Sequence, residues 1–382
     1  MLKFEVDIYT LVEGLKEVKR ALSSKVTSYV LSGVEIVGDE NGVFLTTINA
    51  NTEMKVRSKL TPKSEESVLN VIESGAILID AKRLIEYISK AKTKLIKIEE
   101  VDETAVIVKA GRGKVTFNKM DIKLFPKITI ERDQTTFAVN SNCLLRGLQS
   151  TVLFTTTNSN QPVLSGVLFK IRKDGITVQS TDSFRAGRDT IDVLTQVTEE
   201  RDIIVPSVLL QKVYTLFSRG ETVMITTDGR WIGFEVGDDS IAIRLLDGTY
   251  PDLDNIFDSM TGGQTQLRFM RDELFQLVER ALLFKEDNNA ILSMSWEAQQ
   301  TSVLFGAKSE IGKMKEELET QVITNAPLDI SFNAEFLKDA IRSLPKSAEE
   351  IEFDMYGDMR PFSIRELGSE KSLRIIVPVR KA

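Results

Sequence analysis

Three stretches of the chain contain residue types that could do chemistry, and each is incomplete. Asp252 and Asp254 lie two positions apart, and carboxylates are ligands that Mg²⁺ prefers, but nothing nearby completes a site, so exposed turn aspartates are the simpler interpretation. Residues 306–314, GAKSEIGKM, have five residues between the glycines where a phosphate-binding loop has four. Residues 111–114, GRGK, lack the third glycine of a dinucleotide-binding loop and predict a turn.

The residue types that usually carry enzymatic chemistry are scarce. The chain has no histidine and one cysteine, Cys143. This excludes an internal disulfide, an ordinary zinc cage and every histidine-based catalytic triad. A hydrolase or transferase would have no residue set to support it, so we expect no enzymatic activity, no cofactor and no metal.

Length and composition predict a globular protein of two or three domains. The chain has 382 residues, of which 42% are hydrophobic and 27% charged. No apolar run approaches the roughly 20 residues that span a bilayer, and Glu5 and Asp7 stand where a signal peptide would be basic. We therefore expect a cytoplasmic protein without a membrane partner. The net charge of −7 would argue against nucleic acid, but a sum does not exclude a basic lining on an acidic exterior.

A strand followed by an amphipathic helix recurs along the chain. In the first such unit Asp7 caps a helix whose apolar face carries Leu11, Leu15, Val18 and Leu22. In the fourth, residues 203–205 lead into a helix with Leu209, Leu210 and Val213. The other strand positions are residues 77–79, 137–139, 267–269 and 330–332. Six helices are predicted in all.

The chain also contains an internal repeat. The sequence VLSGV begins at Val30 and again at Val163, a separation of 163 − 30 = 133 residues. The repeat stays in register, because Asn49 and Asp182 are separated by the same number of residues. Such self-similarity indicates repeated domains.

Turn signals divide the remainder into short antiparallel strands. Tight hairpins are predicted at Asn-Gly or Asp-Gly pairs, which begin at residues 41, 174, 228 and 247. Strands followed by proline close three segments, at Pro126, Pro251 and Pro378. We predict an α+β chain of three domains, residues 1–131, 132–262 and 263–382, each with two helices packed on antiparallel sheets.

Several predicted helices carry basic residues opposite their apolar faces. The residues concerned are Lys16 and Arg20 in the first helix, Arg83, Lys90 and Lys94 in the second, and Arg342 and Lys346 in the sixth. Taken singly, each face is an ordinary solvated surface, since Glu13, Glu17, Glu86 and Glu335 share these faces. Because the helices repeat, their charges would add into one basic lining suited to DNA phosphates without sequence preference.

Several motifs together resemble the bacterial DNA polymerase III beta subunit, the sliding clamp. They are the FxV start, TDSFR at 181–185 where the family has TDGHR, DGTYPD at 247–252, MRPF at 359–362 and the IVPVR ending at 376–380. The resemblance implies a head-to-tail homodimer forming a ring that encloses duplex DNA. It also implies DNA contacts at Lys25 and Asn158.

The resemblance further implies a pocket for short linear motifs of the replicative polymerase, the clamp loader and other proteins. The matching positions are Leu164, Thr181, Ser183, Phe184, Arg185, Ala186, Pro251, Asn255, Ile256, Ile375, Val377, Pro378, Val379 and Arg380. Four of them depart from the family pattern: Ser183 replaces glycine, Phe184 histidine, Ala186 leucine and Asn255 a basic residue. These departures indicate a divergent member, encoded by a phage or plasmid or present as a second copy.

For the seam of the ring, the resemblance pairs the first domain of one subunit with the third domain of its partner. The matching residues are Lys114, Val115, Phe117, Leu283 and Phe284; ordinary core packing is the alternative for them. The predicted function is a non-enzymatic processivity clamp. The alternative is a clamp-fold scaffold or decoy that binds proteins and does not encircle DNA.

Overall fold

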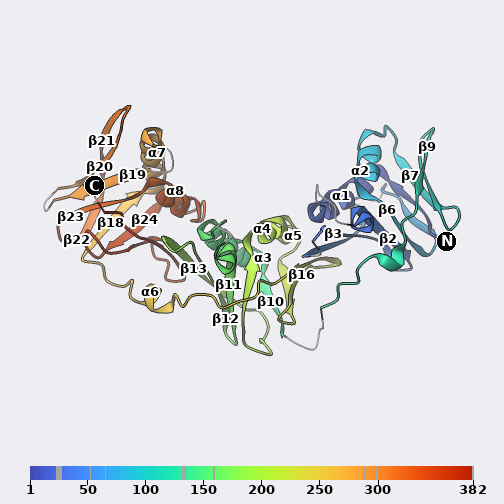
Figure 1. Cartoon of the computed structure of the whole chain (residues 1–382), viewed down its shortest axis with the longest axis horizontal. Helices are drawn as coiled ribbons and strands as arrows, with labels where there is room; N and C mark the ends of the chain where they lie inside the picture. Colours follow the sequence, from blue (N-terminus) through green and yellow to red (C-terminus); the bar gives the residue numbers. More distant parts are fainter. Residues whose placement is uncertain are drawn as a thin grey trace. The chain divides into compact units, whose positions relative to one another are not determined.

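The structure is a computed structural model of the whole chain (Figure 1). It forms two compact units: the first comprises Met1–Ala138 with Lys212–Leu245, and the second Val139–Gln211 with Leu246–Ala382. The structure describes residues 1–22, 28–51, 53–64, 66–130, 135–157, 160–286, 290–297 and 300–380, without the side chains of 324 and 325. The predicted domain boundary between residues 131 and 132 lies outside the described residues.

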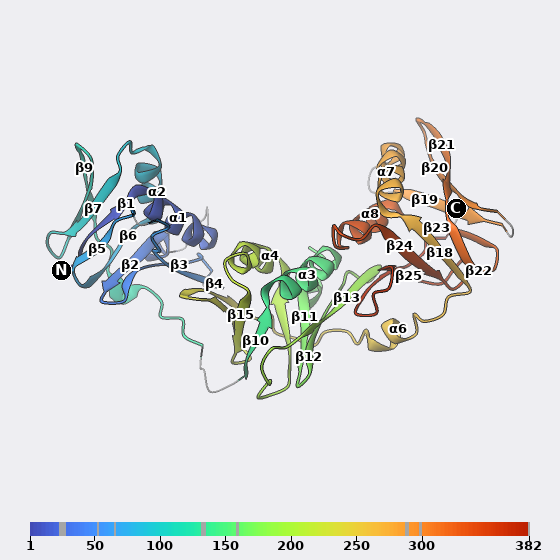
Figure 2. The ribbon, with the colours of Figure 1, turned by 180° about the vertical axis from the view of Figure 1, so that it is seen from behind.

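The first unit contains a five-stranded and an eight-stranded antiparallel sheet. The five-stranded sheet has the order β5 (Leu69–Glu73), β1 (Lys3–Asp7), β7 (Leu95–Glu100), β8 (Ala105–Ala110), β9 (Gly113–Asn118). The eight-stranded sheet has the order β10 (Thr135–Asn140), β15 (Thr222–Thr227), β16 (Trp231–Val236), β17 (Asp239–Arg244), β4 (Met54–Lys59), β3 (Gly42–Ile48), β2 (Gly33–Asp39), β6 (Gly75–Asp80). The helices α1 (Ile8–Val18) and α2 (Ala81–Lys90) lie side by side against these sheets (Figures 1 and 2).

The second unit contains a nine-stranded and a four-stranded sheet. The nine-stranded sheet has the order β14 (Arg201–Pro206), β11 (Gly166–Arg172), β12 (Gly175–Thr181), β13 (Arg185–Asp192), β26 (Ser372–Ile376), β25 (Phe362–Glu366), β24 (Glu350–Met355), β18 (Thr265–Met270), β22 (Gln321–Asn325). The four-stranded sheet has the order β21 (Gly312–Glu319), β20 (Ser302–Ser309), β19 (Ile291–Trp296), β23 (Leu328–Asn333). The helix α3 (Ser141–Thr151) packs on β12 and β13, and α7 (Arg271–Ala281) packs against α8 (Ala334–Arg342).

The internal repeat is present in the structure, element by element. Strand β2 begins at Gly33 and β11 at Gly166, 133 residues later, and both follow a 3₁₀ turn that contains the VLS of VLSGV. The same separation relates β3 to β12 and α1 to α3. Each repeat thus folds its helix and hairpin in the same order.

Two strand pairings recur at equivalent places in the repeats. Strand β4 pairs with β17 in the first unit, which we call the first junction. Strand β13 pairs with β26 in the second unit, which we call the second junction. Each junction joins a strand of one predicted domain to a strand of the next.

The helix ends follow the capping signals only in part. The Asp7 carboxylate accepts a hydrogen bond from Thr10 N at 2.9 Å and caps α1 as predicted. Helix α1 ends at Val18 and tightens into a 3₁₀ turn, Lys19–Ala21, so the expected place of Leu22 on the helix face is wrong. The predicted fourth helix is broken into α4 (Ser207–Leu210), a 3₁₀ turn (Gln211–Val213) and α5 (Tyr214–Phe217).

Most turn predictions are confirmed. Hairpins connect β2 with β3, β11 with β12 and β15 with β16 at the predicted Asn-Gly and Asp-Gly pairs, and the GRGK stretch forms the turn between β8 and β9. The prediction at Asp247 is wrong, because the chain there leaves β17 without a hairpin and leads to a short helix, α6 (Asp254–Asp258). Within the described ranges, no helix has the length and apolar run that a membrane span requires.

Candidate functional site

A buried apolar floor lies beside the second junction. Leu164, Ala186 and Ile375, all predicted pocket residues, belong to one buried cluster. Ala186 pairs directly with Ile375 across β13 and β26, so the sheet register brings them together. The other buried members are Leu168, Ile204, Tyr250, Leu253, Phe257, Met260 and Leu373.

Exposed apolar side chains surround this floor. Phe184 is 60% exposed, Ile256 45% and Val377 37%. Pro251 and Asn255 are also exposed, on the segment that leads into and forms α6. Because the burial of such side chains against a partner is favourable, a floor ringed by exposed apolar groups suits apolar anchors of a peptide.

The TDSFR stretch is a tight turn fixed by its own side chains. The Asp182 carboxylate accepts hydrogen bonds from Phe184 N at 3.0 Å and Arg185 N at 3.1 Å. Thr181 Oγ1 donates to Arg185 O at 2.8 Å. Ser183 has φ +79°, in the left-handed region that favours glycine, which is the residue that the family pattern has there. The turn therefore presents Phe184 outward at a cost in backbone strain.

The Arg185 side chain is held by carboxylates and aromatic rings. Its guanidinium bonds to Asp182 at 2.9 Å and to Asp339 of α8 at 2.6 Å. It also lies 4.5 Å from the ring centre of Phe336, on which Phe184 stacks at 6.5 Å. Along β13, Arg185 and Ala186 face opposite sides of the sheet, so Arg185 supports the rim from the helix side.

The carboxyl-terminal tail is anchored at two points. Val377 N donates to Phe184 O at 3.0 Å, and Val379 N donates to Ser331 O at 2.7 Å. Pro378 and Val379 are half-buried, whereas Arg380 is exposed. The tail thus forms an ordered wall of the groove.

A hollow of about 400 Å³ continues the groove. Tyr250 lies in its wall, accepts a hydrogen bond from Thr181 N at 3.1 Å and donates to Gly166 O at 3.3 Å; burial raises the pKa of its hydroxyl, so it stays protonated. The Lys170 ammonium, by its hydrogen bond, holds the pKa of the Asp254 carboxyl below its usual range. Asp252 Oδ1 accepts from Asp254 N at 3.0 Å, so this aspartate pair shapes the start of α6.

The predicted DNA-contacting residues differ in their surroundings. Lys16 is exposed on α1 and pairs with Glu13 at 2.7 Å, a hydrogen bond that raises the pKa of the lysine. Arg20 lies in the 3₁₀ turn after α1 and bonds to Glu17 at 2.9 Å and to Lys212 O at 3.2 Å. Arg83 and Lys90 are exposed on α2, and Arg342 is exposed at the end of α8. Carboxylates therefore offset part of the basic charge on α1.

Besides Arg20, two more of these residues are not on the helices to which they were assigned. Lys94 lies beyond the end of α2 at Lys90, and its carbonyl accepts from Ile8 N at 3.0 Å. Lys346 follows Pro345, beyond the end of α8, because proline cannot continue the helical hydrogen bonds. Both side chains are exposed. Lys25 and Asn158 lie outside the described residues.

The seam candidates lie on one sheet edge and beside another. Strand β9, which ends the five-stranded sheet, carries exposed Lys114, half-buried Val115 and Phe117, which is buried in its own unit. In the second unit, Leu283 is 71% exposed in a 3₁₀ turn, while Phe284 packs partly against the core beside β21, the end of the four-stranded sheet.

Sequence reasoning missed part of the groove. Leu253 and Phe257 anchor α6 in the floor, and their spacing of four residues was the available signal for a short helix. Outside the groove, Arg146 was also absent from the predicted site residues. It lies on helix α3 with a 42% exposed side chain, 3.6 Å from Asp189.

Comparisons with known proteins match the whole chain. The family models for the N-terminal, central and C-terminal domains of the DNA polymerase III beta subunit match residues 2–129, 138–252 and 261–380. The beta sliding clamp of Bacillus subtilis is 26% identical over 99% of this chain and all of the relative, and that of Staphylococcus aureus 24% over both full lengths.

Solved structures agree. The crystal structure of the DNA polymerase sliding clamp from Bacillus subtilis has a TM-score of 0.92 at 25% identity, and that of the DNA polymerase III beta chain from Streptococcus pneumoniae 0.89 at 26%, each over the full length of both chains. Sliding clamps are non-enzymatic, and their fold consists of three similar domains with helices packed on antiparallel sheets. The chain belongs to the DNA polymerase III beta subunit family and is a DNA sliding clamp.

Proposed function

We propose that two copies of this chain close head to tail into a ring around duplex DNA and tether proteins through the groove beside the second junction. The domain boundaries near residues 131 and 262 are part of the proposal. The clients would be the replicative polymerase, the clamp loader and other proteins with short linear motifs. We place this activity in the cytoplasm, where bacterial DNA is replicated.

The observation that carries the tethering role is the open apolar groove. Its floor is buried and contains Ala186 and Ile375, its rim exposes Phe184, and the anchored tail forms one wall. A short motif with leucine or phenylalanine anchors can bury these groups without refolding either partner. Removing residues 377–382 should therefore abolish binding of a polymerase-tail peptide in a fluorescence anisotropy titration, while the oligomeric state stays unchanged.

The sheet edges support the ring. Strands β9 and β21 end their sheets, and edge strands present backbone groups that can pair with another chain. Exposed Leu283 gives the second edge an apolar neighbour that a partner would cover. We expect a dimeric mass in solution, and a Leu283→Asp variant should shift the mass toward the monomer.

For DNA we propose loose contacts from Lys16, Arg20, Lys25, Arg83, Lys90, Lys94, Asn158, Arg342 and Lys346. Weak contacts suffice if the ring holds DNA by enclosure, and they permit sliding. Protein loaded on a nicked circle should stay bound through a high-salt wash and be released when the circle is cut. Equal loss from circular and linear DNA would instead favour a scaffold or decoy that binds proteins without encircling DNA.

A further inference from the structure

The first junction has the same backbone architecture as the groove. At the second junction, Ala186 pairs with Thr181 on one side and with Ile375 on the other. At the first junction, Lys55 pairs with Ile48 on one side and with Ala242 on the other. Because Ile48 and Thr181 are equivalent in the repeat, Lys55 occupies the place of Ala186, and Ala242 that of Ile375. The repeat thus places a second groove beside the first junction.

This first-junction groove is shaped by small residues in one row across the sheet. Lys55 pairs with Ala242, Ala242 with Gly233 and Gly233 with Thr226, so all four side-chain positions lie on the same face. The middle two are alanine and glycine, which leave a trough between larger neighbours. A hollow of about 300 Å³ is found there, lined also by residues 128–130.

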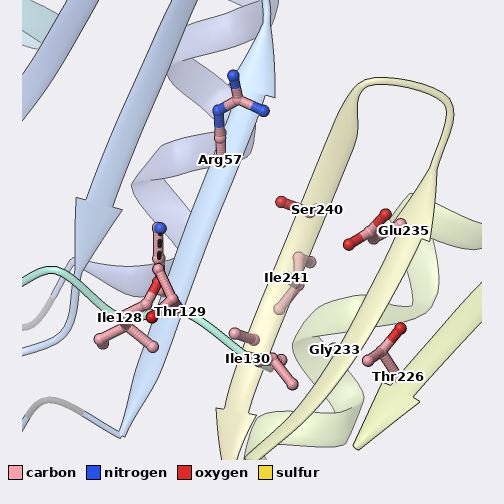
Figure 3. Close-up of a pocket in the computed structure, with 11 residues that line it drawn as sticks. Arg57, Ile128, Thr129, Ile130, Thr226, Gly233, Glu235, Ser240 and Ile241 are labelled. Carbon is pink, nitrogen blue, oxygen red and sulfur yellow. Dashed lines mark hydrogen bonds between the residues drawn. The ribbon is translucent and has the colours of Figure 1, made fainter. Parts of the chain in front are cut away.

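Residues 128–130, which we call the linker segment, lie in this trough. Figure 3 shows Ile128 and Thr129 beside β4, and Ile130 next to Gly233. The Cδ1 atom of Ile130 is 2.7 Å from the place that a Cβ on residue 233 would occupy, so glycine is what makes room for it. A branched side chain at position 233, such as valine, would therefore compete with the Ile130 side chain for this space.

A backbone hydrogen bond holds the other end of the linker segment. Lys55 Nζ donates to Ile128 O at 2.9 Å. To reach this carbonyl, the ammonium gives up part of its contact with solvent. This burial lowers the pKa of Lys55, and the negative charge of Glu35 opposes the effect. Ile128 in addition packs against a buried cluster that contains Ile48 and Phe125. One carbonyl contact and one apolar anchor are how a groove typically holds an extended peptide.

The equivalent segment takes another course at the second junction. After Phe125 and Pro126 the chain enters the first-junction groove in an extended form, whereas after Tyr250 and Pro251 it forms α6. Helix α6 buries Phe257 in the floor and leaves Ile256 exposed at the rim. The second groove therefore stays open.

We propose that the first junction is a second peptide groove, occupied in cis by residues 128–130, so that each chain offers one open groove to partners. The partner that the first-junction groove fits is an extended segment with a β-branched side chain for the Gly233 trough and a carbonyl for Lys55. The description of the second groove as a client site rests on the proposed function, but occupation of the first does not. A segment tethered this close has an effective concentration on the order of millimolar, which excludes weak competitors.

The proposal is tested on the full chain with Ile130→Ser, Gly233→Val and the double variant. The control is Ser240→Ala, a small change in the lining of the same hollow. Two readouts are used: trypsin cleavage after Lys127, located by mass spectrometry, and anisotropy of a labelled hexapeptide with the sequence of residues 125–130, FPKITI.

In the wild type and in Ser240→Ala we expect slow cleavage and no peptide binding. Ile130→Ser should be cleaved about tenfold faster, since cleavage follows the population of the released segment, and should bind the peptide. Gly233→Val should also be cleaved faster, and both variants with valine should fail to bind the peptide because the trough is filled. Equal cleavage in the wild type and all four variants would overturn the proposal. So would peptide binding to Ile130→Ser that persists when valine is added at position 233.

Folding and the proposed client site are controlled separately. Circular dichroism melting is recorded for each variant, and Gly233→Val remains informative if Ile130→Ser does not fold, because valine suits a strand. Binding of a polymerase-tail peptide to the second groove is measured in the same variants and should be unchanged. Absence of this binding in the wild type would contradict the proposed client role of the second groove and would leave the proposal for the first-junction groove unaffected.

Discussion

The two junctions share one strand pairing and differ in what lies on each face of it. On the groove face, the first junction has Lys55 opposite Ala242, and the second has Ala186 opposite Ile375. On the helix face, the first junction pairs Val56 with Ile241, both buried, whereas the second pairs Gly187 with Arg374. A repeated backbone thus supports a filled groove over an apolar layer in one place and an open groove over a buried charge in the other.

The buried charge at the second junction is fully enclosed by partners. Arg374 is 0% exposed and donates to Ser343 O at 2.7 Å, to Ser343 Oγ at 2.8 Å and to Ser372 Oγ. Ser372 Oγ in turn donates to the buried Asp189 at 2.8 Å. Burial lowers the pKa of Arg374 to about 10, and Asp189 opposes this effect, so the guanidinium is still charged at neutral pH.

The largest effect is expected from removing this charge. Arg374→Met should destabilise the second unit by about 3 kcal/mol, because Ser343 O would lose its buried donor and Asp189 would keep only Arg146 as a nearby positive charge. Urea unfolding followed by the fluorescence of Trp296, in a Trp231→Phe background, reports on this unit, since the two tryptophans lie in different units.

The matched control is the equivalent position of the first junction. Ile241→Met should cost less than about 1.5 kcal/mol, because it exchanges apolar groups of similar volume. Replacing both charges, with Asp189→Leu and Arg374→Met, should recover much of the loss. A single Arg374→Met variant as stable as the wild type would show that the ionic network does not distinguish the two junctions.

Exchanging the groove residues tests which junction binds clients. Ala186→Lys copies the first junction into the second and should weaken binding of a polymerase-tail peptide about a hundredfold, because an unpaired polar group in an apolar floor costs about 2–3 kcal/mol. Titration by fluorescence anisotropy measures this. The reverse change, Lys55→Ala, should leave the affinity within about twofold, and an equal loss from both variants would mean that the floor is not specific to the second junction.

The sequence predicted those features that depend on local pattern. The VLSGV repeat located equivalent strands, and Asp7 marked a helix start, because hairpins and caps are set by neighbouring residues. Helix ends were less predictable: Lys94 and Lys346 continue a basic periodicity after the hydrogen-bonded turns have stopped. The four-residue spacing of Leu253 and Phe257 is a weak signal for a helix, because α6 is short and lies inside a loop.

The candidate site was predictable through the family resemblance and not through the pattern alone. Leu164, Ala186 and Ile375 meet because β26 adds to β13 in one register, and this pairing joins residues far apart in sequence. The network around Arg374 was missed, although a charged residue inside the apolar run LRII was a visible anomaly. Its partner Asp189 could be identified only when the register was known. Occupation of the first-junction groove likewise depends on Gly233, and nothing in the sequence around Gly233 indicates that Ile130 packs against it.

The turns that precede the junction strands differ in backbone strain. Ser183 has φ +79°, and among the residues that the structure describes it is the only non-glycine residue with a positive φ. Ser183→Gly should therefore stabilise the second unit by about 0.5–1 kcal/mol. The repeat-equivalent change, Ala50→Gly, should destabilise the first unit by a similar amount, because glycine adds freedom to the unfolded chain. Urea midpoints of both variants measure the pair, and two shifts of the same sign would contradict the assigned strain.

The smallest expected effect is a difference in acid sensitivity. Near the second junction, Asp254 lies three residues after Pro251 and pairs with Lys170. The corresponding residue near the first junction, three residues after Pro126, is Thr129. The folded-state pKa of Asp254 is lowered, so the pair stabilises the protein above the unfolded-state pKa of about 4, and this contribution is lost as the pH falls through the folded value. The side chain is half exposed, so Asp254→Asn should cost under about 1 kcal/mol at pH 6 and nothing near pH 2, whereas Thr129→Asn should show no such convergence. Stability curves of Asp254→Asn and the wild type that stay parallel over this range would show that the ion pair does not contribute to the difference between the junctions.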